Sequence, residues 1–398
     1  MSREIERQLE IIRRGVVEII PEAELRLKLE GALKTGRPLR VKYGIDPTAP
    51  DIHLGHSVPI RKLRDFQELG HRVFFLVGDF TGRIGDPTGR SETRTLLDAE
   101  TVERNLRSYR EQVGRILDLN RIEFVHNADW LGKLTLSDVI KTAASFTVAQ
   151  MLEREDFSRR YAGGNPISLQ EFLYPLLQGY DSVALESDIE IGATEQKFNL
   201  LAGRTIQEIY GQEKQVVITM PILEGTDGVR KMSKSYGNYI PVNAPANEMF
   251  GKLMSIPDAV MERYFRCLTD RSEAEIGALL AGHPKEAKER LARDVVAFYH
   301  GEPAAAAAAA EFSRVFSQGA APDDILTVRR PAGQATPLLE LLVEAGLAPS
   351  RSEARRLIQQ GGVRVNDERV ADPGQTISGP GEFLIKAGKR RFLKLIKE

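Results

Sequence analysis

The chain of 398 residues contains a single cysteine, Cys267, and no long hydrophobic run. One cysteine excludes internal disulfides and C-x-x-C metal sites, and it is typical of a protein from a reducing compartment. No apolar run approaches the ~20 residues that span a membrane, and the charged residues 1–10 do not resemble a signal peptide. We therefore expect a soluble, cytoplasmic protein that does not span a membrane.

The chain also has no excess of charge of either sign: 55 Lys and Arg stand against 56 Asp and Glu, for a formal net charge of −1. A balanced chain is not attracted as a whole to nucleic acid or to a membrane, so any such affinity must come from a local patch. The hydrophobic share of 42% and charged share of 28% are typical of a globular protein, and the length predicts two or three domains.

Residues 39–77 predict the first βαβ unit of a doubly wound parallel sheet. The apolar runs 39–45 and 73–77 are expected strands, and apolar residues recur at helical spacing between them. His53-Leu-Gly-His56 therefore falls where the first loop becomes a helix, at the sheet edge where such folds bind ligands. Both imidazoles could donate to a phosphate. No G-x-G-x-x-G follows the strand, yet we favour nucleotide binding over a structural histidine pair.

Two later loops are expected at the same edge of the sheet. The glycine-rich loop 81–90 follows the second strand and carries Asp86, a carboxylate placed to meet an ammonium group. The strand 187–191 leads into Gly192-Ala-Thr-Glu-Gln196. A surface turn is the alternative for the first loop, but its position after a buried strand favours a ligand site.

A helix that begins after Ser168 carries three polar residues on one face. Tyr174, Gln178 and Asp181 are spaced i, i+4 and i+7 on an otherwise apolar helix, and Ser168 with Glu171 forms a capping-box pattern. A solvated face is the alternative. The lysines and glutamates expected on such a face are missing, which favours a binding face.

Two sequence motifs together carry a resemblance to a known family. His53-Leu-Gly-His56, followed after the last predicted strand (216–220) by Lys231-Met-Ser-Lys-Ser235, resembles the paired motifs of class I aminoacyl-tRNA synthetases. Within that class, Tyr174-x-x-x-Gln178-x-x-Asp181 and the loop with Asp86 resemble the bacterial tyrosyl-tRNA synthetases, over essentially the whole chain. The resemblance implies that L-tyrosine and ATP form tyrosyl adenylate, and that tyrosine is then transferred to the 3′ end of tRNA(Tyr).

The resemblance also implies roles for individual residues. The implied catalytic residues are His53, His56, Lys231 and Lys234. The implied ATP-binding residues are Asp46, Thr48, Gly55, Gly192, Glu195, Met232 and Lys234. The implied tyrosine-binding residues are Asp86, Tyr174, Gln178, Asp181 and Gln196. Mg²⁺ is expected to arrive with ATP, because the sequence shows no carboxylate cage for a metal ion.

Three positions depart from the family pattern. Glu195 stands where an Asp is usual, and Ala193 where a second glycine is usual. Lys42 stands where many members have a tyrosine that contacts the substrate hydroxyl. Tyr43 is no automatic substitute, because adjacent strand residues point to opposite faces. The second partner of the substrate hydroxyl is therefore left unassigned.

The fold class expected is α/β: a Rossmann-like doubly wound parallel sheet, then a helical domain and a small α+β S4 RNA-binding domain. The expected parts are a catalytic domain (1–240) with an insertion (about 130–167), a helical tRNA-binding domain (241–320), a linker (321–336) and the S4 domain (337–398). The insertion resembles the family's dimer interface, so a homodimer is implied.

The last part of the chain carries a local positive charge. Residues 352–366 resemble the S4 module, and residues 350–398 hold 11 Lys and Arg against 6 Asp and Glu. Such a patch suits phosphate contacts. The expected RNA-binding residues are Arg351, Arg355, Arg356, Lys389, Arg390 and Arg391.

Two other functions fit part of the pattern. A tryptophanyl-tRNA synthetase would share both motifs, but it does not use this line of Tyr, Gln and Asp. An S4-bearing RNA-binding protein with an inactive catalytic domain would be expected to lose motif histidines or lysines, and this chain retains all of them.

Overall fold

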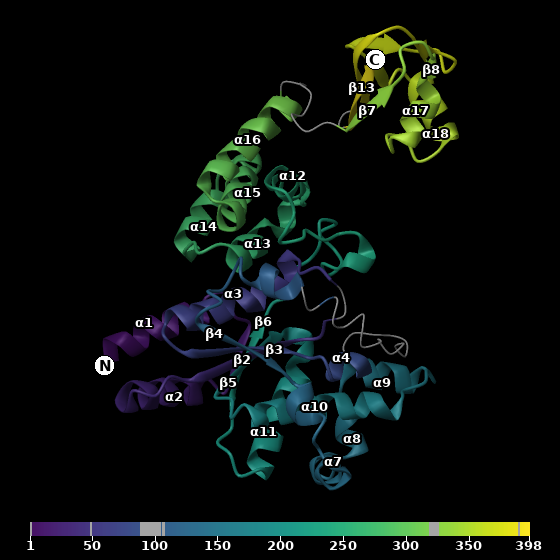
Figure 1. Ribbon diagram of the computed structural model, residues 1–398. Helices are drawn as coiled ribbons and strands as arrows, with labels where there is room; N and C mark the ends of the chain where they lie inside the picture. Colours follow the sequence, from purple (N-terminus) through teal and green to yellow (C-terminus); the bar gives the residue numbers. More distant parts are fainter. Residues whose placement is uncertain (1, 48–49, 88–104, 106–107, 318–325, 389–390) are drawn as a thin grey trace. The chain divides into compact units, whose positions relative to one another are not determined.

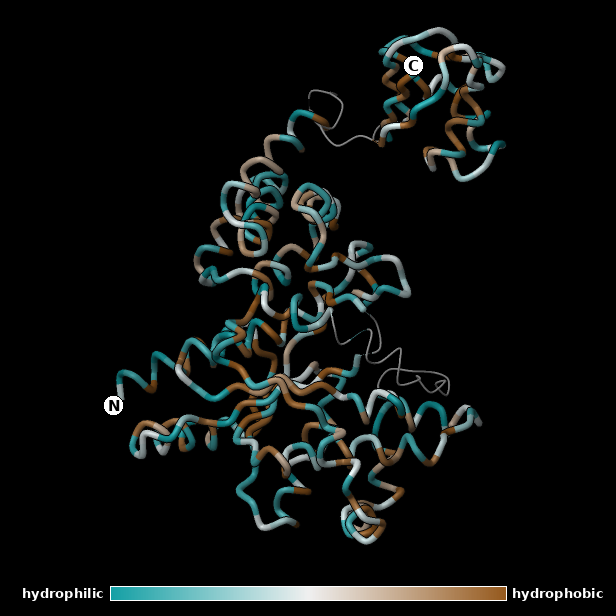
Figure 2. Tube along the Cα trace, in the orientation of Figure 1, coloured by the Kyte–Doolittle hydropathy of each residue, from teal (hydrophilic) through white to brown (hydrophobic). Residues whose placement is uncertain are grey.

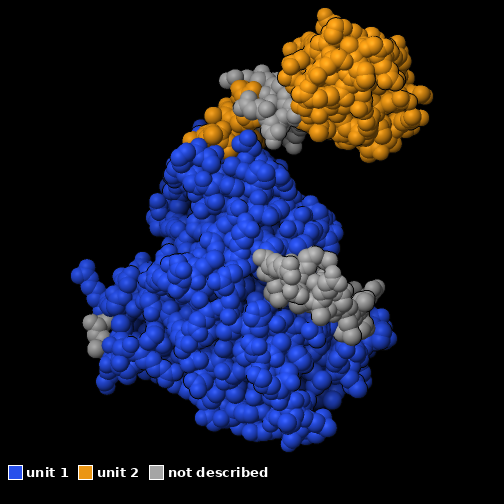
Figure 3. All heavy atoms as spheres, viewed as in Figure 1, with its two compact units in different colours: residues 1–305 blue, residues 306–398 orange. Residues whose placement is uncertain are grey.

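The computed structural model describes residues 2–47, 50–87, 105, 108–317, 326–388 and 391–398. The chain divides into two compact units, Met1–Ala305 and Ala306–Glu398, which Figure 3 distinguishes by colour. None of the described helices is long and apolar enough to cross a membrane. The predicted boundary near residue 240 lies within the first unit and stays a prediction.

The first unit is built on a mostly parallel sheet with the strand order β1-β6-β5-β2-β3-β4. Its strands are β1 (Glu18–Ile20), β2 (Arg40–Ile45), β3 (Arg72–Val77), β4 (Ile122–His126), β5 (Ile189–Ala193) and β6 (Val216–Met220). β2 to β6 run parallel, which confirms the predicted doubly wound sheet. Most apolar side chains of β2, β3, β5 and β6 are buried, while those of the edge strand β4 are half-buried. Figure 2 shows apolar residues in brown along the strands. β1, antiparallel to β6, was missed because three residues are too short for a periodic pattern.

The path of the chain reverses beside β2. From β2 the chain moves outward to β3 and β4, and it then returns to the other side of β2 to form β5 and β6. The loops that leave the carboxyl ends of β2 and β5 therefore diverge. Open α/β sheets bind ligands at such a point, so the fold itself selects this edge for the site.

Helices cover both faces of this sheet, with α3 on one side and α10 and α11 on the other (Figure 1). Their bounds are α3 (Leu54–Glu68), α10 (Leu169–Ala184) and α11 (Lys197–Ile209). The other helices of this part are α1 (Ser2–Arg13), α2 (Glu22–Thr35), α4 (Thr81–Ile84), α6 (Ala128–Leu131), α7 (Leu136–Ala143), α8 (Val148–Met151) and α9 (Glu155–Ala162). α10 and α11 pack through Leu176, Val183 and Ile206. This packing fixes the polar face of α10 against the sheet.

The start of α10 is fixed by a buried ion pair. The Ser168 N–H donates to the Glu171 carboxylate at 2.9 Å, as the capping-box pattern predicted. Arg160 of α9 donates to both oxygens of the same carboxylate, at 2.6 and 2.9 Å, and both side chains are buried. This ion pair therefore joins α9, in the inserted segment, to α10, the helix that carries the polar face.

A helical segment follows the sheet, and the bounds predicted for a helical domain, 241–320, stay a prediction. Its helices are α12 (Ala246–Ser255), α13 (Met261–Leu268), α14 (Glu273–Leu280), α15 (Pro284–His300) and α16 (Glu302–Ser317). The alanine run lies in α16 and is helical, in keeping with alanine's propensity. Asp270 accepts from Arg61 and Arg64 of α3, at 2.8 and 2.7 Å, and so ties this segment to the sheet domain.

Besides the end of α16, the described residues of the second unit form a five-stranded sheet with the order β10-β9-β12-β13-β7, a two-stranded sheet of β8 and β11, and two helices. These elements are β7 (Thr327–Arg330), β8 (Thr336–Pro337), α17 (Leu338–Glu344), α18 (Arg351–Gln359), β9 (Val363–Val365), β10 (Glu368–Val370), β11 (Thr376–Ile377), β12 (Gly381–Ala387) and β13 (Arg391–Lys397). Residues 327–330 were expected in the linker, but they form β7, which pairs with β13 while Val328 packs on the core. The prolines and glycines on either side made this segment resemble a linker, so the strand was not predicted.

The Arg160–Glu171 pair yields a stability prediction. Arg160→Leu leaves a buried carboxylate without its cation, so we expect a loss of about 3–5 kcal/mol in the free energy of unfolding. Arg160→Leu/Glu171→Leu removes both charges and should recover most of that loss. Urea unfolding followed by circular dichroism measures both variants. Equal losses in the single and double variants would contradict the role of the pair.

Candidate active site

His53 and His56 lie where β2 leads into α3. His53 is the N-cap of α3, and its Nδ1 accepts from the His56 backbone N–H at 3.4 Å. The two rings stack with centroids 3.7 Å apart. Burial lowers the pKa of His56 to about 4 and lowers the pKa of His53 well below its usual value. Both rings are therefore neutral near pH 7, and each offers one N–H, that of His53 on Nε2.

Gly55 allows the two motifs to meet. Its N–H points at the Met232 sulfur at 3.3 Å, and a Cβ on Gly55 would lie 3.0 Å from His53 Nδ1 and 3.4 Å from Met232 Cβ. The Leu54 N–H donates to the Ile240 carbonyl at 2.9 Å. The lysine loop at Met232 and the segment after it at Ile240 are thus fixed against the start of α3.

The two loop lysines are held by carboxylates at the edge of the site. Lys231 Nζ lies 3.1 and 3.2 Å from the two Glu195 oxygens, and Lys234 Nζ lies 2.7 Å from Asp51 Oδ2. The hydrogen bond that Lys234 donates to Asp51 raises the pKa of Lys234. The lysine side chains are 40% and 47% exposed. Ion pairs this exposed contribute little free energy, so phosphate oxygens can replace the carboxylates at small cost.

Tyr174 of α10 reaches back to the end of β2. Its hydroxyl donates to Asp46 Oδ2 at 2.9 Å, and Thr81 Oγ1 donates to Asp46 Oδ1 at 2.8 Å. Burial, with Asp46 nearby, raises the pKa of Tyr174, so it stays a neutral phenol. Asp46, expected among the ATP-binding residues, is therefore bonded to a residue expected to bind tyrosine.

Asp181 is a buried carboxylate held by two donors. It is 1% exposed, and it accepts from Trp130 Nε1 at 2.7 Å and from Asn127 Nδ2 at 3.3 Å. Burial raises the pKa of Asp181 to about 7, against the lowering effects of Lys42 and of these two donors. Sequence reasoning missed Asn127 and Trp130. The sequence feature that could have indicated them is their position directly after the strand 122–126, at the edge of the sheet that carries the other site residues.

Gln178 is held by side chains from β5 and α11. Its Nε2 donates to Glu190 Oε1 at 3.1 Å, and Asn199 Nδ2 donates to its Oε1 at 3.0 Å. Gln196 Nε2 donates to Asp86 Oδ2 at 3.3 Å, which brings together two residues from the loops after β3 and β5. Glu190 and Asn199 were not expected from the sequence, because each lies within an ordinary strand or helix pattern.

The end of β5 packs closely at Gly192. A Cβ on Gly192 would lie 2.9 Å from both Leu200 methyl carbons, so the strand packs closely on α11 here. Ala193 occupies the second glycine position, and its N–H donates to Gln196 Oε1 at 3.0 Å. A glycine would offer the same backbone N–H, so this departure from the family pattern does not alter the contact with Gln196.

The expected RNA-binding residues that the structure describes lie on the surface of the second unit. Arg351, Arg355 and Arg356 lie on α18, and Arg391 begins β13; all four are exposed. Arg351 bonds to Glu340 at 2.9 Å and Arg356 to Glu353 at 2.7 Å. Thr48, Lys389 and Arg390 lie outside the described residues.

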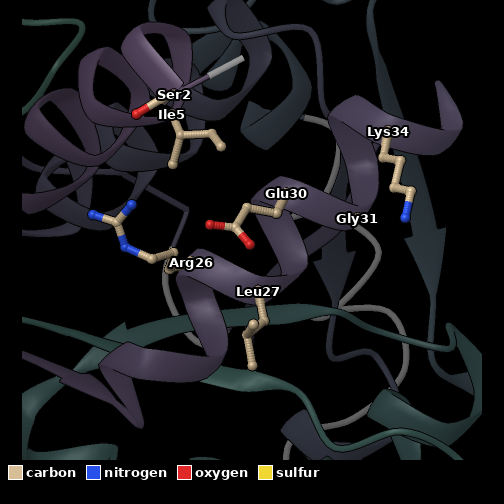
Figure 4. A pocket seen from close by; sticks show the side chains of 7 residues that line it. All are labelled: Ser2, Ile5, Arg26, Leu27, Glu30, Gly31 and Lys34. Carbon is tan, nitrogen blue, oxygen red and sulfur yellow. The ribbon is translucent and has the colours of Figure 1, made fainter.

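Two further features bear on ligands. Among residues with a described placement, no group of three or more His, Cys, Asp or Glu could hold a metal ion. A surface cavity of about 530 Å³ lies between α1 and α2 (Figure 4). Its lining residues are Ser2, Ile5, Arg26, Leu27, Glu30, Gly31 and Lys34. None of them belongs to the expected site.

The chain is similar to known proteins over nearly its whole length. The family model described as tRNA synthetases class I (W and Y) matches residues 34–317, and that of the S4 domain matches residues 336–384. A tyrosine–tRNA ligase of Geobacter sulfurreducens is 54% identical over 395 residues, which cover 98% of each chain. One from Moorella thermoacetica is 53% identical over 403 residues, which cover 99% of this chain and 97% of the relative.

Solved structures agree on the fold. The C-terminally truncated mitochondrial tyrosyl-tRNA synthetase of Aspergillus nidulans superposes with a TM-score of 0.64 at 24% identity, over 79% of this chain and 94% of that one. The curated relatives decide against the tryptophanyl alternative. On the family matches and the near-full-length identity, the chain belongs to the tyrosine–tRNA ligases of the class I tRNA synthetases.

Proposed function

We propose that the residues around the carboxyl ends of β2 and β5 perform the two steps of this tyrosine–tRNA ligase. L-Tyrosine and ATP form tyrosyl adenylate and pyrophosphate, and tyrosine then passes to the 3′ end of tRNA(Tyr). The observation that carries this assignment is the buried Asp181, which Trp130 and Asn127 hold at 2.7 and 3.3 Å at the end of the polar face of α10.

In this proposal side chains of α10 recognise the substrate amino acid. Asp181 accepts the hydrogen of the phenolic hydroxyl, and Gln196 lies near the substrate carboxylate. The groups around the substrate ammonium are Asp86, Tyr174 and Gln178. All three can accept a hydrogen bond from a cation. Gln178 is already fixed by the buried Glu190, and Tyr174 by the half-buried Asp46. Fixed acceptors cost little reorganisation when the substrate binds.

ATP lies between the two motifs in this proposal. A tyrosine carboxylate oxygen attacks the α-phosphorus, and the bond to the pyrophosphate oxygen breaks, so negative charge grows on the leaving group. His53 and His56 donate from the start of α3, and Lys231 and Lys234 leave their carboxylate partners for the phosphates. The other proposed ATP contacts are Asp46, Thr48, Gly55, Gly192, Glu195 and Met232. Mg²⁺ would be held mainly by the phosphates, because the described residues offer no metal cage.

Exposed apolar side chains support the proposed homodimer. They lie on and beside the helices of the inserted segment, where a monomer would leave them in water. The residues are Leu136, Ile140, Val148, Tyr161 and Leu169, at 75, 60, 67, 70 and 80% exposed. The mass of the particle in solution tests this. We place the enzyme in the cytoplasm because translation consumes its product there.

The first test concerns Lys234. If its ammonium acts on charge that develops as pyrophosphate leaves, Lys234→Ala should lower kcat for tyrosine-dependent pyrophosphate exchange by about 10²–10³ with little change in the tyrosine KM. Lys214, which pairs with Glu208 at 3.2 Å and is 39% exposed, is the matched control. Lys214→Ala should leave kcat unchanged. A large rise in the tyrosine KM with normal kcat would disprove the assignment.

The second test uses the titration of Asp181. Its pKa is raised to about 7, so the acceptor is protonated in a growing share of free enzyme as the pH falls below 7. The kcat/KM for tyrosine, divided by that for phenylalanine, should therefore fall as the pH drops from about 8 to about 5.5. The quotient cancels the ionisation of ATP, which affects both substrates alike. Asp181→Asn should lower the quotient and make it independent of pH; a persistent pH dependence would point to another group.

The third test separates activation from RNA binding. Arg351→Ala/Arg355→Ala/Arg356→Ala should raise the KM for tRNA and reduce its salt dependence, by a slope of roughly one for each phosphate that the variant no longer neutralises. Pyrophosphate exchange should be unaffected, because all proposed contacts of that step lie in the first unit. Unchanged charging at every salt concentration would show that α18 does not contact RNA.

A further inference from the structure

The proposed roles leave one buried ion pair unexplained. Lys42 of β2 and Glu190 of β5 are register partners on adjacent parallel strands. Lys42 Nζ lies 3.1 Å from Glu190 Oε1, and the two residues are 1% and 2% exposed. Removing two charges from water costs free energy that their attraction does not reliably recover. A pair at the point where ligand-binding loops diverge therefore requires a reason other than stability.

Glu190 uses its oxygens fully. Besides Lys42, it accepts from Gln178 Nε2 at 3.1 Å, from Ser182 Oγ at 3.3 Å and from Gln215 Nε2 at 2.5 Å. Such a set of donors fixes a carboxylate in place. Glu190 thus serves as an anchor for the ammonium group, and the function of the pair must reside in Lys42.

One hydrogen of the Lys42 ammonium group has no acceptor among the residues that the structure describes. Its ammonium group carries three, of which one faces Glu190 and another donates to the Gln178 backbone carbonyl at 3.2 Å. No other hydrogen-bond acceptor for Lys42 occurs among the residues that the structure describes. A cation buried this fully, with an unused donor, is suited to bind an oxygen that arrives with a ligand.

The spare donor lies at the Asp181 end of the site. Asp46 directly follows β2 and lies four residues after Lys42, an even spacing that places both on the same side of the extended chain. α10 runs past that face so that Tyr174 bonds to Asp46 and the Gln178 carbonyl bonds to Lys42. Asp181 follows Gln178 by one helical turn. The Lys42 charge also acts on Asp181, whose pKa it lowers against the effect of burial.

We propose that Lys42 is a second specificity-determining residue, whose free N–H donates to the phenolic oxygen of tyrosine while Asp181 accepts the phenolic hydrogen. This inference rests on the proposed role of Asp181. The site would then select a para substituent that both donates and accepts. Phenylalanine does neither. 4-Aminophenylalanine donates to Asp181 but accepts poorly, because the nitrogen lone pair is conjugated with the ring.

The unmodified enzyme gives the first measurement. In pyrophosphate exchange, kcat/KM for 4-aminophenylalanine should lie roughly 10-fold to 10²-fold below that for tyrosine, the size expected for one hydrogen bond to a charged group. It should still exceed the value for phenylalanine. If tyrosine and 4-aminophenylalanine are used equally well, no donor reads the phenolic oxygen and the inference fails. This measurement needs no variant to fold.

A paired substitution then assigns the effect to Lys42. Lys42→Met/Glu190→Gln removes both buried charges together, so that neither remains without its partner. The preference for tyrosine over 4-aminophenylalanine should fall towards 1, while tyrosine should remain preferred over phenylalanine because Asp181 is intact. An unchanged preference over 4-aminophenylalanine in the folded variant would overturn the role of Lys42.

Two controls separate this inference from other failures. Lys62 and Asp65 form another buried pair, 2.6 Å apart on α3. Lys62→Met/Asp65→Asn should lower the use of all three substrates alike and leave their ratios unchanged. Asp181→Asn tests the proposed function itself: if its preference for tyrosine over phenylalanine persists, the role of Asp181 fails. If that preference collapses while the Lys42 variant retains its ratios, only the inference on Lys42 fails.

Discussion

The parallel pairing of β2 with β5 is the constraint on which the rest of the site depends. It places Lys42 opposite Glu190 and sends the loops after the two strands in different directions. One loop carries the histidines to the start of α3, and the other carries Glu195 and Gln196. A slip of one residue would turn every side chain of the strand to the other face, so the register and the site are specified together.

Two kinds of polar contact occur at this edge of the sheet: buried contacts and partly exposed ion pairs. Buried contacts, such as those of Asp181 and Glu190, have several partners each and little freedom, which suits them to discriminate one side chain from another. The pairs of Lys231 and Lys234 are 40% and 47% exposed on the lysine side and exchange partners at small cost. In the proposed mechanism, selection of the amino acid thus depends on rigid groups, and binding of phosphate depends on exchangeable ones.

The departures from the family pattern acquire physical meaning in this setting. Glu195 has one methylene more than the usual Asp and contacts Lys231 with both oxygens, which links the loop after β5 to the lysine loop. Lys42 places a cation at 1% exposure, which requires a counter-charge, and Glu190 supplies it. The charge on one strand is therefore balanced on its neighbour.

The sequence by itself determined the parallel strands, the helices between them, the two paired motifs and the polar face of α10, because each is a local pattern with a fixed period or spacing. It did not reveal β1 or β7, which are too short or too irregular to leave such a pattern. Only the tertiary structure decided which side chains meet. Asn127 and Trp130 reach Asp181 across 54 and 51 residues, and Lys42 reaches the backbone of Gln178 across 136. Such contacts arise from strand order and crossover direction, and neither is encoded in any short stretch of chain.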